Sequence, residues 1–351
     1  MATIKNLQKK TDRSTTKRIT SIDVAHRAGV SQSTVSRALN PNSKLAEDLR
    51  QKVLVAAREL GYKPNAIARS LTSRRTNIIG LVMSDPTSPF YHQVLSSFTD
   101  KLQQAGLQTL LFNAAPGKDI DDILDRVLQY QVDGLIITGA TITSEMADEC
   151  VKNGTPVILF NRYIPGANIS AVCCNDVEGG RKVADFLVNA GHKRLAYISG
   201  KKNASTSINR YKGFIERLNE LGNYECLVEY GGYSYESGVE AAKRLLMRKN
   251  QPDAIFCVND IMALGVMDVA RFELGISIPK DLSVIGFDDI PEASRAVYSL
   301  TTIYQPIEQM VDATIKLLQE RVENRNVEPV LQLFEGKLIE RSSTRLISNN
   351  K

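Results

Sequence analysis

The chain has 351 residues, 43% of them hydrophobic and 24% charged, which is enough for two or three domains and at least one sizeable core. Mean hydropathy is −0.18, and no stretch approaches the ~18–20 uncharged apolar residues that a membrane helix needs. The N-terminus also lacks the apolar segment of a signal peptide, so we expect a cytoplasmic protein rather than a membrane or secreted one. The 5 cysteines form an odd set without metal-ligand spacing, which predicts reduced, mostly buried thiols and no metal site.

Charge is distributed unevenly along the chain. Residues 1–75 contain 16 Lys and Arg against 5 Asp and Glu, a net charge of +11; since the whole chain carries +5, residues 76–351 carry −6. A basic head on a mildly acidic body indicates a polyanionic partner for the head, because phosphates would neutralise the clustered positive charge. A solvated charged tail is the alternative that charge alone leaves open.

Two short helices around a tight turn are predicted by residues 20–39, TSIDVAHRAGVSQSTVSRAL. Thr20 or Ser21 can cap the first helix, and Gly29 supplies the left-handed residue that ends it. The apolar positions expected in the first helix are Ile22, Val24, Ala25 and Ala28. A small residue at 25, glycine at 29 and a β-branched residue at 35 are typical of a helix-turn-helix, whose two axes cross at a steep angle.

The second helix, capped by Ser31, is expected to expose a polar side to DNA. Arg37 on that side can reach a guanine edge with two hydrogen bonds. An ordinary helical hairpin with a polar outer face has the same periodicity and remains the alternative. The DNA-contacting residues expected in this region are Ser31, Gln32, Ser33, Thr34, Ser36 and Arg37.

A third helix from about Leu45 to Leu60 completes the predicted three-helix core, and Gly61 stops it. After Pro64, the residue Asn65 can cap one further short helix.

Four segments resemble the LacI/GalR family of bacterial transcription regulators: DVAHRAGVSQSTVSRALN, ARELGYKPNAIARSLTSRRTNIIGLV, VNDIMALG and VIGFDD. The resemblance covers about residues 19–342. It implies that the segment after the third helix is a hinge helix, which orders on operator DNA and inserts Leu71 into the minor groove. A linker leucine packed on the body is the alternative for Leu71. The further DNA contacts implied in the hinge are Asn65, Ala68, Arg69 and Leu71.

From Asn77 onward, short apolar runs alternate with amphipathic helices, which predicts parallel sheets. A fresh strand-helix start near Ala171 indicates two subdomains, and the resemblance implies the periplasmic sugar-binding-protein fold. The candidate strands are Ile78–Met83, Gln108–Phe112, Gly134–Thr138, Val157–Phe160, Leu195–Ser199, Leu227–Tyr230, Ala254–Val258 and Leu282–Phe287.

The expected fold class is therefore α plus α/β: a three-helix helix-turn-helix head, a hinge helix and a periplasmic-binding-protein-like body of two α/β subdomains. The expected boundaries are a basic tail over 1–18, the head over 19–63, the hinge and linker over 64–76, the effector-binding and dimerisation body over 77–342, and a C-terminal tail over 343–351.

Ligands of open α/β sheets bind beyond the carboxyl ends of the strands, where this sequence places several polar and aromatic residues. Asp260 and Asp289 are interpreted there as caps of following helices or turns. The effector contacts that the resemblance implies are Phe90, Tyr91, Asn161, Arg162, Tyr233, Asn259, Asp288 and Gln305, to which Arg210 is added as a candidate.

One departure affects the expected ligand. Sugar-binding relatives often carry R-x-R-x-x-G-F, and here Ile208 stands in place of the first arginine, which makes a simple sugar less certain. Arg210 is interpreted as either an effector contact or a structural residue. Lys201, Lys202 and Asn203 either favour an anionic ligand or are solvated.

No nucleotide-binding, zinc-protease or nucleophile-elbow motif is present, and His92 is the only histidine considered as a catalyst. We therefore expect no enzyme and no cofactor. The prediction is a transcriptional regulator, in the first instance a repressor, whose partners are pseudopalindromic operator DNA and a small effector, with a sugar or sugar derivative favoured. A homodimer is preferred over a tetramer, because leucine heptads do not follow residue 342. A ligand-binding protein without a transcriptional role is the alternative.

Overall fold

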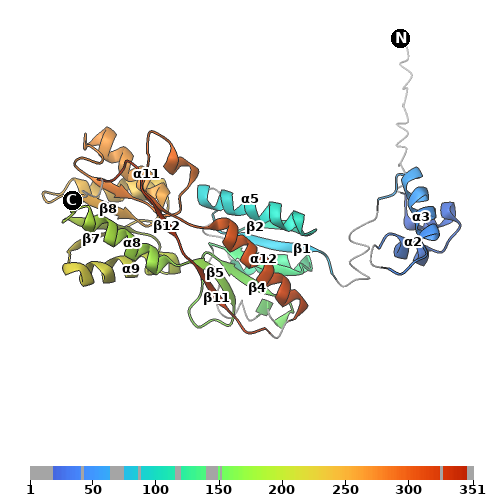
Figure 1. Ribbon diagram of the computed structural model, residues 1–351. Coiled ribbons are helices and arrows are strands. Elements are labelled where there is room, and N and C mark those ends of the chain that lie inside the picture. Colours follow the sequence, from blue (N-terminus) through green and yellow to red (C-terminus); the bar gives the residue numbers. More distant parts are fainter. Residues whose placement is uncertain are drawn as a thin grey trace, which may run out of the picture. The chain divides into compact units, whose positions relative to one another are not determined.

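The computed structural model describes residues 19–40, 43–63, 75–85, 88–114, 120–139, 149–150, 152–324 and 327–345. The chain divides into two compact units, Met1–Thr76 and Asn77–Lys351, called here the head and the body (Figure 1). The hinge segment expected at 64–76 lies outside the described residues up to position 74, and so do Asn65, Ala68, Arg69 and Leu71.

The described part of the head contains three helices: α1 (Ser21–Ala28), α2 (Gln32–Ala38) and α3 (Glu47–Glu59). Thr20 caps α1 in a capping box with Asp23, and Gly29 ends that helix at φ 64°. The core expected from the sequence forms around Val24 and Val35, both fully buried. Ile22 was expected among the apolar positions of α1, and that was wrong: its side chain is 62% exposed, on the outer face of the helix.

The first sheet of the body has 6 parallel strands in the order β11-β5-β4-β3-β1-β2. Most of its central strands are buried apolar runs, as expected for strands covered by helices on both faces. The strands are β1 (Ile78–Met83), β2 (Gln108–Asn113), β3 (Gly134–Thr138), β4 (Val157–Phe160), β5 (Ser170–Cys174) and β11 (Leu331–Phe334), and the helices are α5 (Pro89–Gln104), α6 (Ile120–Gln129) and α12 (Ile307–Glu323).

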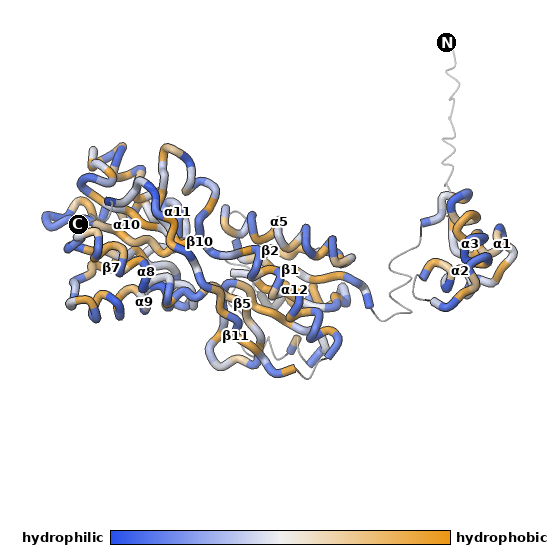
Figure 2. Tube along the Cα trace, in the orientation of Figure 1, coloured by the Kyte–Doolittle hydropathy of each residue, from blue (hydrophilic) through white to orange (hydrophobic). Residues whose placement is uncertain are grey.

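The second sheet has 4 parallel strands in the order β7-β6-β8-β9. Its strands are β6 (Leu195–Ser199), β7 (Cys226–Tyr230), β8 (Ala254–Cys257) and β9 (Ser283–Ile285). Its helices are α8 (Asp176–Asn189), α9 (Ser205–Gly222), α10 (Tyr235–Leu246) and α11 (Asp260–Asp268), followed by a π-helical turn at Val269–Glu273 and a 3-10 turn at Pro291–Ser294. Figure 2 shows apolar stretches along the strands of the body and alternating polar and apolar residues along helices such as α5 and α12.

The chain passes between the two subdomains three times. It leaves the first sheet after β5, returns from β10 (Thr302–Tyr304) into α12, and passes from β11 to β12 (Lys337–Ile339), which pairs antiparallel with β10. The strand-helix start expected near Ala171 is present as β5 and α8; β5 belongs to the first sheet, so the second subdomain begins with α8.

The end of the body also extends beyond the expected residue 342. Ser343 is fully buried, and its hydroxyl donates to the Val284 carbonyl at 2.6 Å. No helix in the described part of the chain is long and apolar enough to cross a membrane.

Candidate functional site

The first candidate site is the exposed side of α2. The Ser31 hydroxyl accepts from the Thr34 backbone N–H at 3.2 Å and so caps the helix as expected. Gln32, Ser36 and Arg37 are exposed, and Ser33 is also exposed beside the cap. Thr34 was expected on this exposed side, but it is only 8% exposed; its hydroxyl lies 2.8 Å from that of the capping Ser31.

One basic residue of the head, Arg50, has a structural role that the sequence did not indicate. Arg50 of α3 donates to the carbonyls of Ala38, at 2.9 Å, and Asn40, at 3.0 Å. These carbonyls lie at the C-terminal end of α2, where a helix leaves acceptors unpaired. Arg50 therefore fixes the end of α2, and the helix keeps Arg37 exposed.

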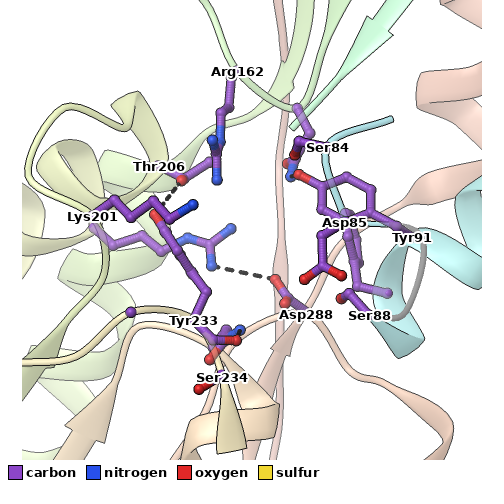
Figure 3. Close-up of a pocket in the computed structure, with 15 residues that line it drawn as sticks. Ser84, Asp85, Ser88, Tyr91, Arg162, Lys201, Thr206, Tyr233, Ser234 and Asp288 are labelled. Atoms are coloured by element: carbon purple, nitrogen blue, oxygen red, sulfur yellow. Dashed lines mark hydrogen bonds and ion pairs between the residues drawn. The ribbon is translucent and has the colours of Figure 1, made fainter. Parts of the chain in front are cut away.

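The second candidate site is a cleft of about 310 Å³ between the two subdomains (Figure 3). Its walls come from segments that follow the carboxyl ends of β1, β4, β6, β7, β8 and β9 and from the N-terminal parts of α5 and α9. Eight of the nine residues expected here line it: Phe90, Tyr91, Asn161, Arg162, Arg210, Tyr233, Asn259 and Asp288. The ninth, Gln305, is fully buried and lies outside the lining; its amide donates to Asp288 at 2.7 Å.

Sequence reasoning missed several lining residues. Ser84 and Asp85 directly follow β1, a position that the rule about strand ends could have identified. Thr206 lies in the first turn of α9, and Ser234 caps α10. Helix first turns carry no comparable sequence signal of a cleft, so these two could be found only from the fold.

Arg210 forms the charged floor of the cleft. Its guanidinium donates to Asp176 at 2.8 Å, to the Val258 carbonyl at 2.6 Å and to Asp288 at 3.2 Å. The same group lies 3.6 Å from the centre of the Phe287 ring. Burial disfavours its charge, but the two carboxylates outweigh burial and hold the pKa of Arg210 above its ordinary value. Arg210 is thus structural, and it also faces the cleft.

The neighbouring carboxylates respond to the same environment. Burial raises the pKa of Asp288 and of Asp176, and Arg210 opposes the rise in both. Asp260 lies behind Asp288 and outside the lining, where it accepts from Thr302 at 2.5 Å and from the Ile290 N–H at 2.9 Å. The expectation that Asp260 and Asp289 act as caps is wrong: Asn259 caps α11, and Asp289 pairs with Arg341 at 2.7 Å.

Three lining residues have left-handed backbones that non-glycine residues rarely adopt: Asn161 at φ 65°, Tyr233 at φ 72° and Asp288 at φ 120°. Such strained positions gather at ligand sites in many proteins. Two glycines leave room for the rings: a Cβ on Gly139 would meet the Tyr91 hydroxyl at 2.5 Å, and one on Gly200 would meet the Tyr233 ring at 2.3 Å. The backbone itself therefore places the aromatic walls.

Comparison with known proteins identifies the family. Residues 21–65 match the model of bacterial regulatory proteins of the lacI family, and residues 184–344 match a periplasmic binding protein-like domain. The HTH-type transcriptional repressor PurR of Photobacterium profundum is 33% identical over 92% of this chain and 98% of its own. The chain belongs to the LacI family.

Other LacI-family proteins match over similar lengths. The HTH-type transcriptional regulator DegA of Bacillus subtilis (strain 168) is 37% identical over 82% of this chain and 87% of its own. A structure of the lac repressor dimer bound to operator and the anti-inducer ONPF has a TM-score of 0.85 at 26% identity, covering 94% of this chain and 100% of that one. A transcriptional regulator CelR–cellobiose complex has a TM-score of 0.71 at 31% identity, covering 93% and 100%. The chain is accordingly a DNA-binding transcriptional regulator controlled by a small-molecule effector.

Proposed function

We propose that this regulator acts in the cytoplasm as a homodimeric repressor, and that Gln32, Ser33, Ser36 and Arg37 of each α2 read one half of a pseudopalindromic operator. Support comes from the exposed polar side of α2, which Ser31 caps and Arg50 fixes. Two heads related by a dimer axis would match two half-sites. The hinge contacts implied by the resemblance, at Asn65, Ala68, Arg69 and Leu71, belong to the same proposal.

The DNA assignment is tested on an operator selected from random duplexes by the wild-type protein. Arg37→Ala should weaken binding to that operator by roughly 5- to 150-fold, corresponding to about 1–3 kcal/mol for a bidentate base contact. Arg58→Ala, an exposed charge-matched control on α3, should weaken specific and random DNA alike and only slightly. Equal losses on operator and random DNA in Arg37→Ala would show that Arg37 contacts phosphate rather than a base.

We also propose that the effector binds in the cleft between the subdomains and is a sugar or sugar derivative. The observation that carries this is the convergence of three aromatic rings, strained backbone and polar groups on about 310 Å³, the size range of small-molecule sites. Similar structures include a CelR–cellobiose complex and a regulator from Enterococcus faecium with bound ribose. His92, the histidine considered as a catalyst, is exposed on α5 and does not line the cleft.

A thermal-shift panel tests the effector proposal. Its neutral set holds aldopentoses, aldohexoses and cellobiose, and its acidic set holds the hexonates, hexuronates and hexose phosphates. A ligand at 100-fold its dissociation constant stabilises the protein by about 2.7 kcal/mol. Asp288→Asn should abolish the shift, whereas Asp289→Asn, which perturbs only the pair with Arg341, should keep it. A shift that survives Asp288→Asn would place the ligand elsewhere.

A further inference from the structure

Two cations in the cleft differ from Arg210 in having no carboxylate partner among the described residues. Arg162 follows β4 of the first subdomain, and Lys201 follows β6 of the second. In Figure 3 the Arg162 side chain enters the cleft from the top and the Lys201 side chain from the left, while Asp85 lies at the right. The Arg162 guanidinium donates to the Gly139 carbonyl and lies 5.3 Å from the centre of the Tyr233 ring. Its position is therefore fixed before any ligand arrives.

Unused hydrogen-bonding atoms accompany these charges. The Nε of Arg162 is buried and meets no acceptor within the described part of the chain. The Oδ1 of Asn161, a residue only 5% exposed, likewise meets no donor there. Burying a polar atom without a partner is unfavourable because its hydration is lost, so a bound molecule that supplies both partners removes both penalties.

The atoms without partners indicate which hydrogen-bonding groups a ligand would supply. The buried Arg162 Nε requires an acceptor, and the exposed Lys201 ammonium lines the same cleft from the other subdomain; two cations that line one cleft favour an anionic acceptor. The Asn161 Oδ1 requires a donor, and Asp288 on the floor also accepts hydrogen bonds. A neutral sugar would satisfy the hydroxyl requirement but would leave the two charges uncompensated.

We propose that the effector is an acidic sugar derivative of about monosaccharide size, whose carboxylate or phosphate lies between Arg162 and Lys201 and whose hydroxyls meet Asn161 and Asp288. This inference rests on the proposed effector site and names the ligand class for it. Because Arg162 and Lys201 belong to different subdomains, the anion would also bridge them. Binding would then stabilise the arrangement of the two subdomains in which Arg162 and Lys201 can both contact the anion.

The acidic and neutral sets of the panel test this directly, and the hexonates and hexuronates are compared with the hexose phosphates to separate the two anions. We expect at least one acidic member to bind, with an affinity that falls as salt rises. Lys201→Met and Arg162→Met should each weaken its binding about tenfold or more, which corresponds to at least about 1.4 kcal/mol. Lys202→Met is the matched control, because this neighbouring lysine lies outside the cleft lining and should leave binding unchanged.

The outcomes separate the inference from the function on which it rests. A neutral sugar that binds through Asp288 with equal affinity in wild type and Lys201→Met would overturn the acidic ligand and leave the effector site in place. Failure of every acidic member to bind would overturn the inference as well. Failure of both sets would overturn the sugar effector itself. Lys201 is exposed, so its substitution leaves folding intact and the comparison decisive.

Discussion

Replacing Arg210 by methionine should reduce stability strongly, because the guanidinium compensates two buried carboxylates. Arg210 is 2% exposed, and Asp176 and Asp288 are 4% and 8% exposed. Methionine fills similar space but removes both ion pairs, the hydrogen bond to the Val258 carbonyl and the cation–π contact with Phe287. Removing one partner of a buried pair costs about 3–5 kcal/mol, since it leaves an uncompensated charge.

The loss should depend on pH in a defined direction. The pKa of Asp176 and of Asp288 is already raised by burial, and removing the nearby cation raises it further. A carboxyl whose pKa is higher in the folded than in the unfolded state lowers stability as pH rises above its pKa in the unfolded chain. Arg210→Met should therefore be least stable relative to wild type near pH 8 and should recover part of the difference near pH 5, where the carboxyls take up protons.

Urea unfolding of the intact chain at both pH values measures this. The control is Arg217→Met on the same helix, whose partners Asp185 and Glu220 lie at the surface, and it should change stability little. The reasoning is refuted if Arg210→Met loses less than about 1 kcal/mol at pH 8, the upper range of a surface pair. Equal losses in the two variants at both pH values would refute it too.

Two further substitutions test the packing and the electrostatics of the second subdomain. Gly180→Ala should lower the free energy of unfolding, measured in urea, by about 1–3 kcal/mol. The added Cβ would lie 2.3 Å from the Arg210 carbonyl oxygen and would force α8 and α9 apart. Unchanged stability would contradict this close helix crossing. Burial and Asp288 raise the pKa of Asp260, so wild-type stability should fall as pH rises above the unfolded pKa of this carboxyl, and Asp260→Asn should flatten that slope. An equal slope in both proteins would assign the effect to other groups.

Local sequence rules predicted the head well because its signals are local. Thr20, Gly29 and Ser31 act as the expected start and stop residues, and Val35 is fully buried. Ile22 and Thr34 were misplaced, since period alone does not fix which edge of a short helix faces its neighbours. Thr34 lies on the buried side of α2, where its hydroxyl is 2.8 Å from that of Ser31.

Local sequence rules were not sufficient to assign the strands of the body to their sheets. A buried parallel strand reads as an apolar run whichever sheet it joins, so β5 could not be assigned from its own residues. The return of the chain into α12 and β11 is likewise a long-range event. For the cleft, the strand-end rule found the residues that follow β4, β8 and β9, whereas Gln305 was misplaced because it follows β10, which lies behind Asp288.

Polar contacts between described residues join the two sides of the cleft, in addition to the apolar core that the two subdomains share. The Tyr163 N–H donates to the Ser205 hydroxyl at 3.2 Å, the Asn209 amide donates to the Tyr163 hydroxyl at 3.1 Å, and Arg162 lies over the Tyr233 ring. Each such contact contributes roughly 0.5–1.5 kcal/mol. A ligand that favours one arrangement of the subdomains by about 3 kcal/mol changes their ratio more than a hundredfold, which is comparable to the sum of these contacts. An effector of that strength can therefore compete with the polar contacts across the cleft.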